Sequence, residues 1–177
     1  MRKKKEKIKE QQAIVISLKS ARVEDILNGD ETHIINIRRP NKDKLHFPLD
    51  VYIHCTNRGE RNIELPWTPH APKQHKGRGN GNNMVVAKFT LNEVTPVYID
   101  DLKDVVNKTR MRYFEIYKYL NIDYFNTAPD QILGWLWKID DLIVFENPRP
   151  LQDFGLLTTP QMWTIIKKYQ GENIYIC

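Results

Sequence analysis

The chain has 177 residues, of which 41% are hydrophobic and 28% are charged, and its formal net charge is +5. This length and apolar content are typical of one globular domain and exclude repetitive or collagen-like classes. No apolar run reaches the roughly 18 residues that span a bilayer, and no apolar stretch follows the basic N-terminus as in a signal peptide. We therefore expect a cytoplasmic protein.

The positive charge is concentrated in two segments. Residues 1–12 contain six Lys or Arg and two Glu, which accounts for +4 of the +5, and we predict that they form a flexible tail before a single domain at 13–177. Lys73, Lys76 and Arg78 lie in a Gly-, Asn- and Pro-rich stretch that predicts a mobile basic loop at about 68–82. Basic arms on a neutral body are typical of phosphate contacts, although a Lys-rich tail can also serve only to keep a chain soluble.

The first elements are predicted from short periodic runs. Residues 13–18 form a β-branched run that predicts a strand, and apolar residues at helical spacing then predict a short helix that Gly29 ends. Residues 33–39 predict a second strand. Alternation places Thr32, Ile34, Asn36 and Arg38 on one face of it, and this more polar face is the candidate for a site.

The remaining segments predict further strands and an insertion. Residues 50–56 and 84–91 alternate as strands, with Val51, Ile53 and Cys55 pointing inward. Residues 99–126 predict a helical insertion, because apolar residues recur at helical spacing twice within them. A long apolar run at 133–145 predicts strand structure, and an amphipathic piece at 162–169 and a strand-like end at 173–177 complete the domain.

The order of these segments resembles the ASCH domain, a PUA-like family. The segments that carry the resemblance are 13–40 (AIVISLKSARVEDILNGDETHIINIRRP), 51–56, 84–90, 136–142, 148–151 and 160–163, in the order seen in phage and prophage ASCH proteins. The resemblance implies an α+β fold, a PUA-like β-barrel of about five to six mostly antiparallel strands with a helix after the first strand. It also implies a cleft that accepts RNA or a single modified base.

The family signature is approximately Gly-x-Lys-x-x-Glu-x-Arg. Gly29 matches it, Glu31 stands at the lysine, and Arg38 matches if two residues are inserted, which puts Asn36 at the acidic position. In the acetylcytidine amidohydrolases of similar fold, this segment supplies a lysine and a threonine. The corresponding catalytic candidates are Glu31 and Thr32, but adjacent strand side chains point to opposite faces, so the sequence favours a protein without enzymatic activity.

The predicted function is binding of RNA or another nucleic acid through a cleft near residues 29–39. Arg38 and Arg39 can bind phosphate, and Asn36 can pair with a base. Trp137, with Trp135 and Trp163, can stack on a base or can simply fill the core. The predicted nucleic-acid-binding residues are Lys19, Asn36, Arg38, Arg39, Trp137, Lys138, Lys73, Lys76 and Arg78.

Two alternatives stay open at this point. One is an ASCH-type hydrolase acting on acetylated cytidine or RNA, and the other is a phage accessory protein that binds a host protein. The five histidines share no metal-ligand spacing and the two cysteines form no CxxC pair, so we predict neither a metal nor a cofactor.

Overall fold

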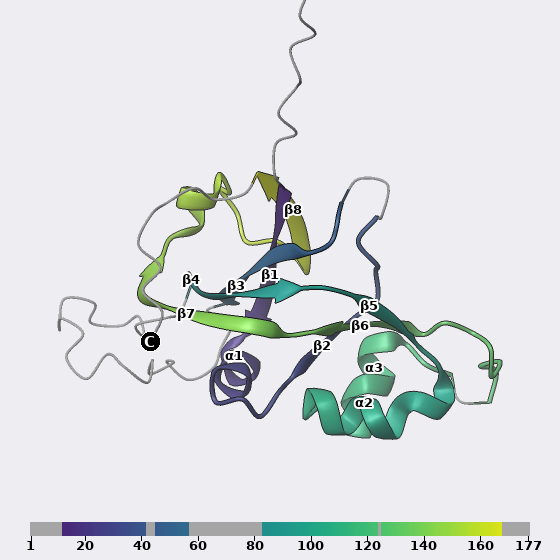
Figure 1. The fold of residues 1–177 in the computed structure, drawn as a ribbon. Helices are drawn as coiled ribbons and strands as arrows, with labels where there is room; N and C mark the ends of the chain where they lie inside the picture. The colour runs from purple at the N-terminus through teal and green to yellow at the C-terminus, as the bar shows by residue number, and fades with distance from the viewer. Residues whose placement is uncertain (1–11, 42–44, 57–82, 124, 168–177) are drawn as a thin grey trace, which may run out of the picture.

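The computed structural model describes residues 12–41, 45–56, 83–123 and 125–167. They form a mixed α+β structure with two sheets (Figure 1). One sheet has five strands in the order β7-β4-β3-β1-β8: β1 (Gln12–Lys19), β3 (Leu49–Thr56), β4 (Met84–Leu91), β7 (Asp140–Arg149) and β8 (Trp163–Lys167). The other has three strands in the order β2-β6-β5: β2 (His33–Asn36), β5 (Val94–Val97) and β6 (Gly134–Lys138).

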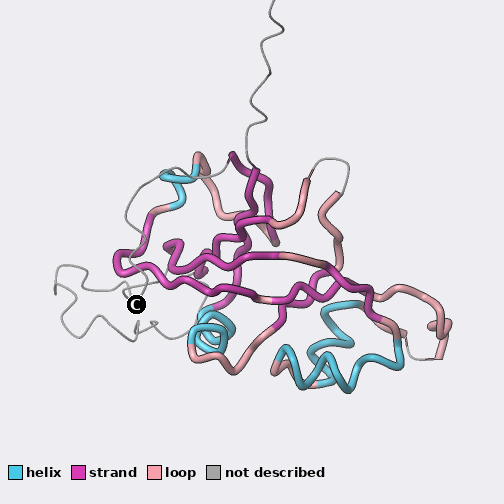
Figure 2. Tube along the Cα trace, viewed as in Figure 1, coloured by secondary structure: helices cyan, strands magenta, loops and turns pink. Residues whose placement is uncertain are grey.

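Three α-helices and two short 3-10 helices join these strands (Figure 2). They are α1 (Ser20–Leu27), η1 (Ile99–Asp101), α2 (Leu102–Thr109), α3 (Tyr113–Leu120) and η2 (Leu151–Phe154). The helix after the first strand is therefore present. The helical segment between β5 and β6 corresponds to the insertion expected at 99–126.

The sheet arrangement differs from the single barrel that the sequence predicts. The described strands form two separate sheets and do not close into one barrel. Of their strand pairings, only that of β1 with β3 is parallel, so the prediction of mostly antiparallel strands is confirmed. Gln12, assigned to the tail from sequence, is the first residue of β1.

A bent antiparallel ribbon connects the two sheets. Its two arms are β4 followed by β5, and β6 followed by β7, so each arm leaves one sheet and enters the other. At the bend, Asn92 Nδ2 donates a 2.9 Å hydrogen bond to Asp140, and Asp141 has a left-handed φ of 47°. Strands that change sheets commonly do so at such irregular corners. The apolar run predicted at 133–145 is thus two strands separated by Ile139.

The end of α1 follows the prediction closely. Gly29 adopts φ +78°, a left-handed conformation that favours glycine, and its N–H donates to the Ile26 carbonyl oxygen. The chain therefore leaves the helix there and enters the short loop before β2.

Three apolar clusters hold the structure together. The main cluster lies between the sheets and includes Val51, Ile53 and Cys55, which point inward as predicted. A second cluster covers the other face of the five-stranded sheet, where Tyr52 packs 4.9 Å from the ring of Phe154 in η2. A third cluster packs α2 and α3 on the three-stranded sheet. Both sheets are therefore covered on two faces.

Neither a membrane-spanning helix nor a cluster of potential metal ligands is found in the described ranges. None of the helices in them is long and apolar enough to cross a bilayer. No group of three or more His, Cys, Asp or Glu side chains within them is arranged to hold a metal ion.

Candidate nucleic-acid interface

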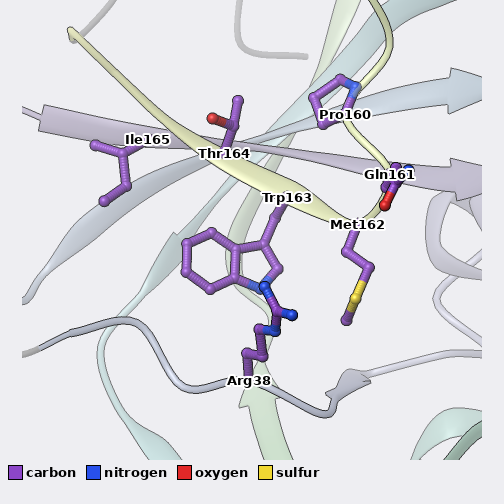
Figure 3. Close-up of a pocket in the computed structure, with 7 residues that line it drawn as sticks. All are labelled: Arg38, Pro160, Gln161, Met162, Trp163, Thr164 and Ile165. Carbon is purple, nitrogen blue, oxygen red and sulfur yellow. The ribbon is translucent and has the colours of Figure 1, made fainter.

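A pocket of about 570 Å³ opens between β8 and the loop that follows β2. Its lining residues are Arg38, Pro160, Gln161, Met162, Trp163, Thr164 and Ile165. Figure 3 shows the Arg38 side chain extending from the loop toward Trp163 and Met162. Arg38 is exposed and Trp163 is partly buried, so a guanidinium and an indole are both open to a ligand.

Backbone contacts anchor the pocket to the five-stranded sheet. Trp163 pairs with Ile16 of β1, and the Ser17 N–H donates a 2.8 Å hydrogen bond to the Met162 carbonyl oxygen. The Ser17 side chain lies on the other face of the sheet, where its Oγ is 3.3 Å from His54 Nδ1. Burial lowers the pKa of His54 to about 4, so its imidazole is neutral near pH 7.

Arg39 lies beside Arg38 but makes a different contact. Its guanidinium carbon is 4.8 Å from the ring centroid of Trp135 on β6, which is a cation–π distance. Trp135 is opposite Asn36 in the β2–β6 ladder. The two neighbouring arginines therefore both lie next to a tryptophan, one at the pocket and one at the three-stranded sheet.

Asn36 and Trp137 lie on the inner face of the three-stranded sheet and are not open to solvent. Asn36 is 2% exposed and Trp137 is 0% exposed, because this face packs against the five-stranded sheet. The Trp137 ring is 5.7 Å from that of Trp163, between their centroids. The polar face that alternation predicts for β2 is thus an interior face, and Trp137 packs within the core in this structure.

Two of the predicted lysines, Lys19 and Lys138, are among the described residues and lie apart from the pocket. Lys19 ends β1, three residues past the partner of Trp163, which is about 10 Å along a strand. Lys138 pairs with His33 at the opposite end of the β2–β6 ladder from Asn36, and its Nζ is 2.8 Å from Asp140. Lys73, Lys76 and Arg78 lie outside the described residues.

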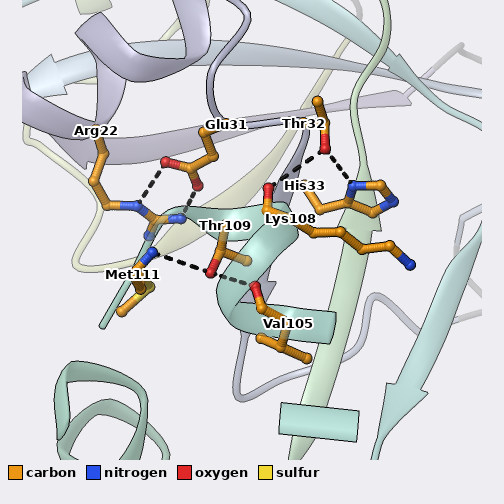
Figure 4. Close-up of polar contacts among 8 residues, drawn as sticks. All are labelled: Arg22, Glu31, Thr32, His33, Val105, Lys108, Thr109 and Met111. Carbon is orange, nitrogen blue, oxygen red and sulfur yellow. Dashed lines mark hydrogen bonds and ion pairs between the residues drawn. The ribbon is translucent and has the colours of Figure 1, made fainter. Parts of the chain in front are cut away.

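Glu31 is a buried ion-pair partner. Its carboxylate accepts two hydrogen bonds from the Arg22 guanidinium on α1, one of them 3.2 Å from Nε (Figure 4). Glu31 is 1% exposed, and this burial raises its pKa to about 7, although the charge and hydrogen bonds of Arg22 oppose the rise. The residue at the lysine position of the family signature therefore ties α1 to the loop before β2.

Thr32 points to the surface, and its hydroxyl partner is not Glu31. Thr32 Oγ1 is 2.9 Å from His33 Nδ1 and 3.4 Å from the Lys108 carbonyl oxygen of α2 (Figure 4). Burial, together with the positive charge of Lys108, lowers the pKa of His33, which favours the neutral imidazole. His33 Nδ1 is therefore the titratable nitrogen beside the Thr32 hydroxyl, which also donates to the Lys108 carbonyl oxygen.

The last turn of α2 supports this contact. The Thr109 hydroxyl donates a 2.8 Å hydrogen bond to the Val105 carbonyl oxygen and accepts one from the Met111 N–H at 3.4 Å. Arg110 then takes a left-handed φ of 56° and ends the helix. The Lys108 carbonyl oxygen is left to accept from the Thr32 N–H at 3.0 Å, which docks the loop before β2 on α2.

Comparisons with known proteins show which fold this arrangement belongs to. No family model matches the sequence, and no curated protein matches it significantly. Three crystal structures of the ASCH protein from Zymomonas mobilis do match. A serine-to-alanine variant has a TM-score of 0.57 and 13% identity, with 88% of each chain covered. A tyrosine-to-phenylalanine variant has a TM-score of 0.53 and 14% identity, covering 86% of this chain and 88% of that one.

The structure solved without a named substitution gives the same result. Its TM-score is 0.52 at 12% identity, with 86% of this chain and 85% of that chain covered. The chain therefore shares its two-sheet α+β fold with these structures of the ASCH protein. This likeness confirms the ASCH-type fold that the sequence resemblance implies, but not its phage and prophage type.

Arg22 and His33 of the site were not among the predicted residues. Arg22, which pairs with Glu31, lies on the helix that the sequence predicts, but no local pattern indicates its partner. Trp135 and Trp163, by contrast, were predicted together with Trp137 as side chains that could stack on a base. Their contacts with Arg39 and Arg38 depend on pairings between distant segments.

Proposed function

We propose that the chain binds RNA or a related single-stranded nucleic acid at the pocket between Arg38 and β8. The observation that carries this proposal is the composition of the pocket. An exposed guanidinium lies beside a partly exposed indole, and none of the seven lining residues is acidic. Guanidinium groups bind phosphate with charge-assisted hydrogen bonds, and indoles stack on bases.

Two further features support the same proposal. Arg39 adds a second cation next to Arg38, and its stacking on Trp135 restricts the orientation of its guanidinium. The ASCH fold is the second feature, since the resemblance in the sequence implies a cleft that accepts RNA. The basic residues of 1–12 and of the predicted loop at 68–82 would add contacts to phosphates.

The test is a titration of fluorescein-labelled single-stranded RNA by fluorescence anisotropy. We expect Arg38→Gln to weaken binding about tenfold, because a charge-assisted hydrogen bond contributes roughly 1.5–3 kcal/mol. Lys103→Gln is the matched control, since it removes one exposed charge from α2, which packs on the opposite face of the three-stranded sheet. Equal affinities of the two variants would contradict the proposal.

A hydrolase is a second candidate, and the contact between Thr32 and His33 favours it. A hydroxyl 2.9 Å from a neutral imidazole is the geometry of a nucleophile and its base. Turnover of acetylcytidine or of single-stranded RNA should then be lost in Thr32→Ala and in His33→Ala, while Glu31→Gln should retain it. Absence of turnover in the unaltered protein would remove this candidate.

A further inference from the structure

Three buried side-chain nitrogens on the inner side of the three-stranded sheet have no hydrogen-bond partner among the described residues. They are Asn36 Nδ2, Arg39 Nε and Trp137 Nε1. Each carries an N–H donor, and a buried donor without an acceptor keeps the full cost of leaving water. Three such donors in one region need a common explanation.

The strand register places these donors close to one another. Asn36 is opposite Trp135, and Ile34 is opposite Trp137, so Asn36, Trp135 and Trp137 project from the same face. Arg39 lies over the Trp135 ring at 4.8 Å. The three donors therefore all neighbour Trp135 on this face, although they come from two strands and a loop.

The same region adjoins the proposed nucleic-acid pocket. Trp163 lines the pocket beside Arg38 and also contacts Trp137, with 5.7 Å between the ring centroids. Asn36 is the last residue of β2 and lies two residues before Arg38. A base that stacks at Trp163 would lie next to Trp137, while Asn36 and Arg39 neighbour Trp135 on the same face. Because the three donor nitrogens are buried, the base reaches them only if Trp163, which is partly exposed, moves as it enters.

The chemistry of the donors restricts the ligand. The three unpartnered groups of this face are all N–H donors, so they match oxygen acceptors and do not match amino groups. Among the bases, uracil presents two carbonyl oxygens, whereas adenine has none and presents an amino group. A phosphate group has a partner in Arg38, which lines the pocket and is exposed, so the three buried donors are left for the base.

We infer that the pocket selects a uracil-type base, whose carbonyl oxygens accept hydrogen bonds from Asn36, Trp137 and Arg39 while its phosphate binds Arg38. This inference rests on the proposed function and adds the class of base to it. It predicts that uridine 5′-monophosphate binds about tenfold more tightly than adenosine 5′-monophosphate, which corresponds to one hydrogen bond or slightly more.

The first experiment uses the unaltered full chain labelled with nitrogen-15. The indole N–H signals are recorded during titration with uridine monophosphate, adenosine monophosphate and inorganic phosphate, and Trp137→Phe assigns the signal of Trp137. We expect only uridine monophosphate to move that signal downfield, since a carbonyl oxygen then accepts from Nε1–H. A Trp137 signal that responds identically to all three probes would overturn the inference.

The second experiment changes the donor at Asn36. Asn36→Asp replaces the N–H donor by an acceptor of the same shape, and Asn36→Leu removes it at similar volume. Each should reduce the preference for uridine over adenosine monophosphate about tenfold, whereas Asn107→Asp on the surface of α2 should not. The leucine variant keeps the test open if a buried carboxylate prevents folding.

The outcomes separate the inference from the function on which it rests. If RNA binds and Arg38→Gln weakens it, but both nucleotides bind equally, the base selection is wrong and the proposed function stands. If neither nucleotide nor single-stranded RNA binds, both are wrong.

Discussion

Glu31 is a buried carboxylate that forms an ion pair with Arg22. Its carboxylate is 1% exposed, and its partner Arg22 has a side chain that is 21% exposed. A buried carboxylate contributes to stability only if its charge is well compensated or removed by protonation. Burial has the larger effect here and raises the pKa of Glu31 to about 7.

This raised pKa predicts a specific pH dependence of stability. The folded-state pKa exceeds the ordinary value of 4.5, so between these values the folded chain binds more protons than the unfolded chain. Its contribution is therefore complete below about pH 4.5 and is lost as the pH rises through 7. From pH 5 to pH 7.5 the free energy of unfolding should fall by about 2 kcal/mol through this group.

Urea unfolding at both pH values, compared between the unaltered protein and Glu31→Gln, measures this contribution. The glutamine does not titrate, so the loss of stability with pH should be about 2 kcal/mol smaller in the variant. Glu146→Gln, an exposed position on β7, is the control and should leave the pH dependence unchanged. Identical pH dependence in Glu31→Gln and the unaltered protein would contradict the account of this residue.

At this scale the sequence predicts some residues of the site and not their surroundings. Arg38 was predicted from its charge and position, and it does line the pocket. Alternation correctly put Asn36 on the same side of the strand as Ile34. It could not show that this side is interior, because that depends on the five-stranded sheet packed opposite.

The packing of α3 on the three-stranded sheet depends on a glycine. A Cβ at Gly134 would lie 2.9 Å from Leu120 Cδ2 and 3.0 Å from the Asn36 carbonyl oxygen. The leucine can shift, but the carbonyl belongs to the β2 backbone and cannot move without disturbing the ladder. Gly134 is thus required by close approach of α3, β2 and β6.

We expect Gly134→Ala to destabilise the protein by about 1–3 kcal/mol through overpacking. Thermal and urea unfolding of Gly134→Ala, Leu120→Ala and the double variant test this in a double-mutant cycle. Leu120→Ala removes the side-chain contact, so the alanine at 134 should cost less in that background. Strict additivity of the two free-energy changes would show that Leu120 is not what the added methyl group meets.

The elements differ in how far local sequence determines them. The helix at 113–120 follows from apolar residues at i, i+3, i+4 and i+7, and the end of α1 follows from Gly29. The strand β5 was not predicted, since it has only four residues and contains Pro96. Proline fits there because β5 is at the edge of its sheet, a property of the tertiary arrangement.

In the whole molecule, most of the net positive charge belongs to residues 1–11 and not to the residues that line the pocket. Residues 1–11 contain the same six Lys or Arg and two Glu as the predicted tail, and the rest of the chain is nearly neutral. If the tail and the pocket both contact phosphates, the tail should supply the salt-dependent part of the affinity for RNA. The pocket should supply the part of the affinity that depends on which base is bound.

Deletion of residues 1–11 should therefore reduce the salt dependence of RNA binding. The slope of log affinity against log salt should become less steep by up to about 4, since single strands give roughly 0.7 per neutralised phosphate for six basic residues. Anisotropy titrations between 50 and 300 mM salt measure it, and the deletion stops before Gln12 because β1 begins there. An unchanged slope would show that the tail does not contact the nucleic acid.

The sequence predicts the overall architecture only in part, and the reason is physical. The helix after the first strand and the helical insertion follow from local patterns, whereas the mostly antiparallel strands follow only from the family resemblance. Whether strands close into one barrel or form two sheets depends on where the ribbon of β4–β5 and β6–β7 bends. That bend is set by contacts such as Asn92 with Asp140, which are 48 residues apart.

The most direct test of the account is ultraviolet crosslinking of a uracil-containing single-stranded RNA to the full chain, with the crosslinked peptides identified by mass spectrometry. The account predicts crosslinks to Trp163 and to its neighbours within 160–165, and their loss in Arg38→Gln. Crosslinks confined to residues 1–11 and 57–82, with none at the pocket, would contradict it.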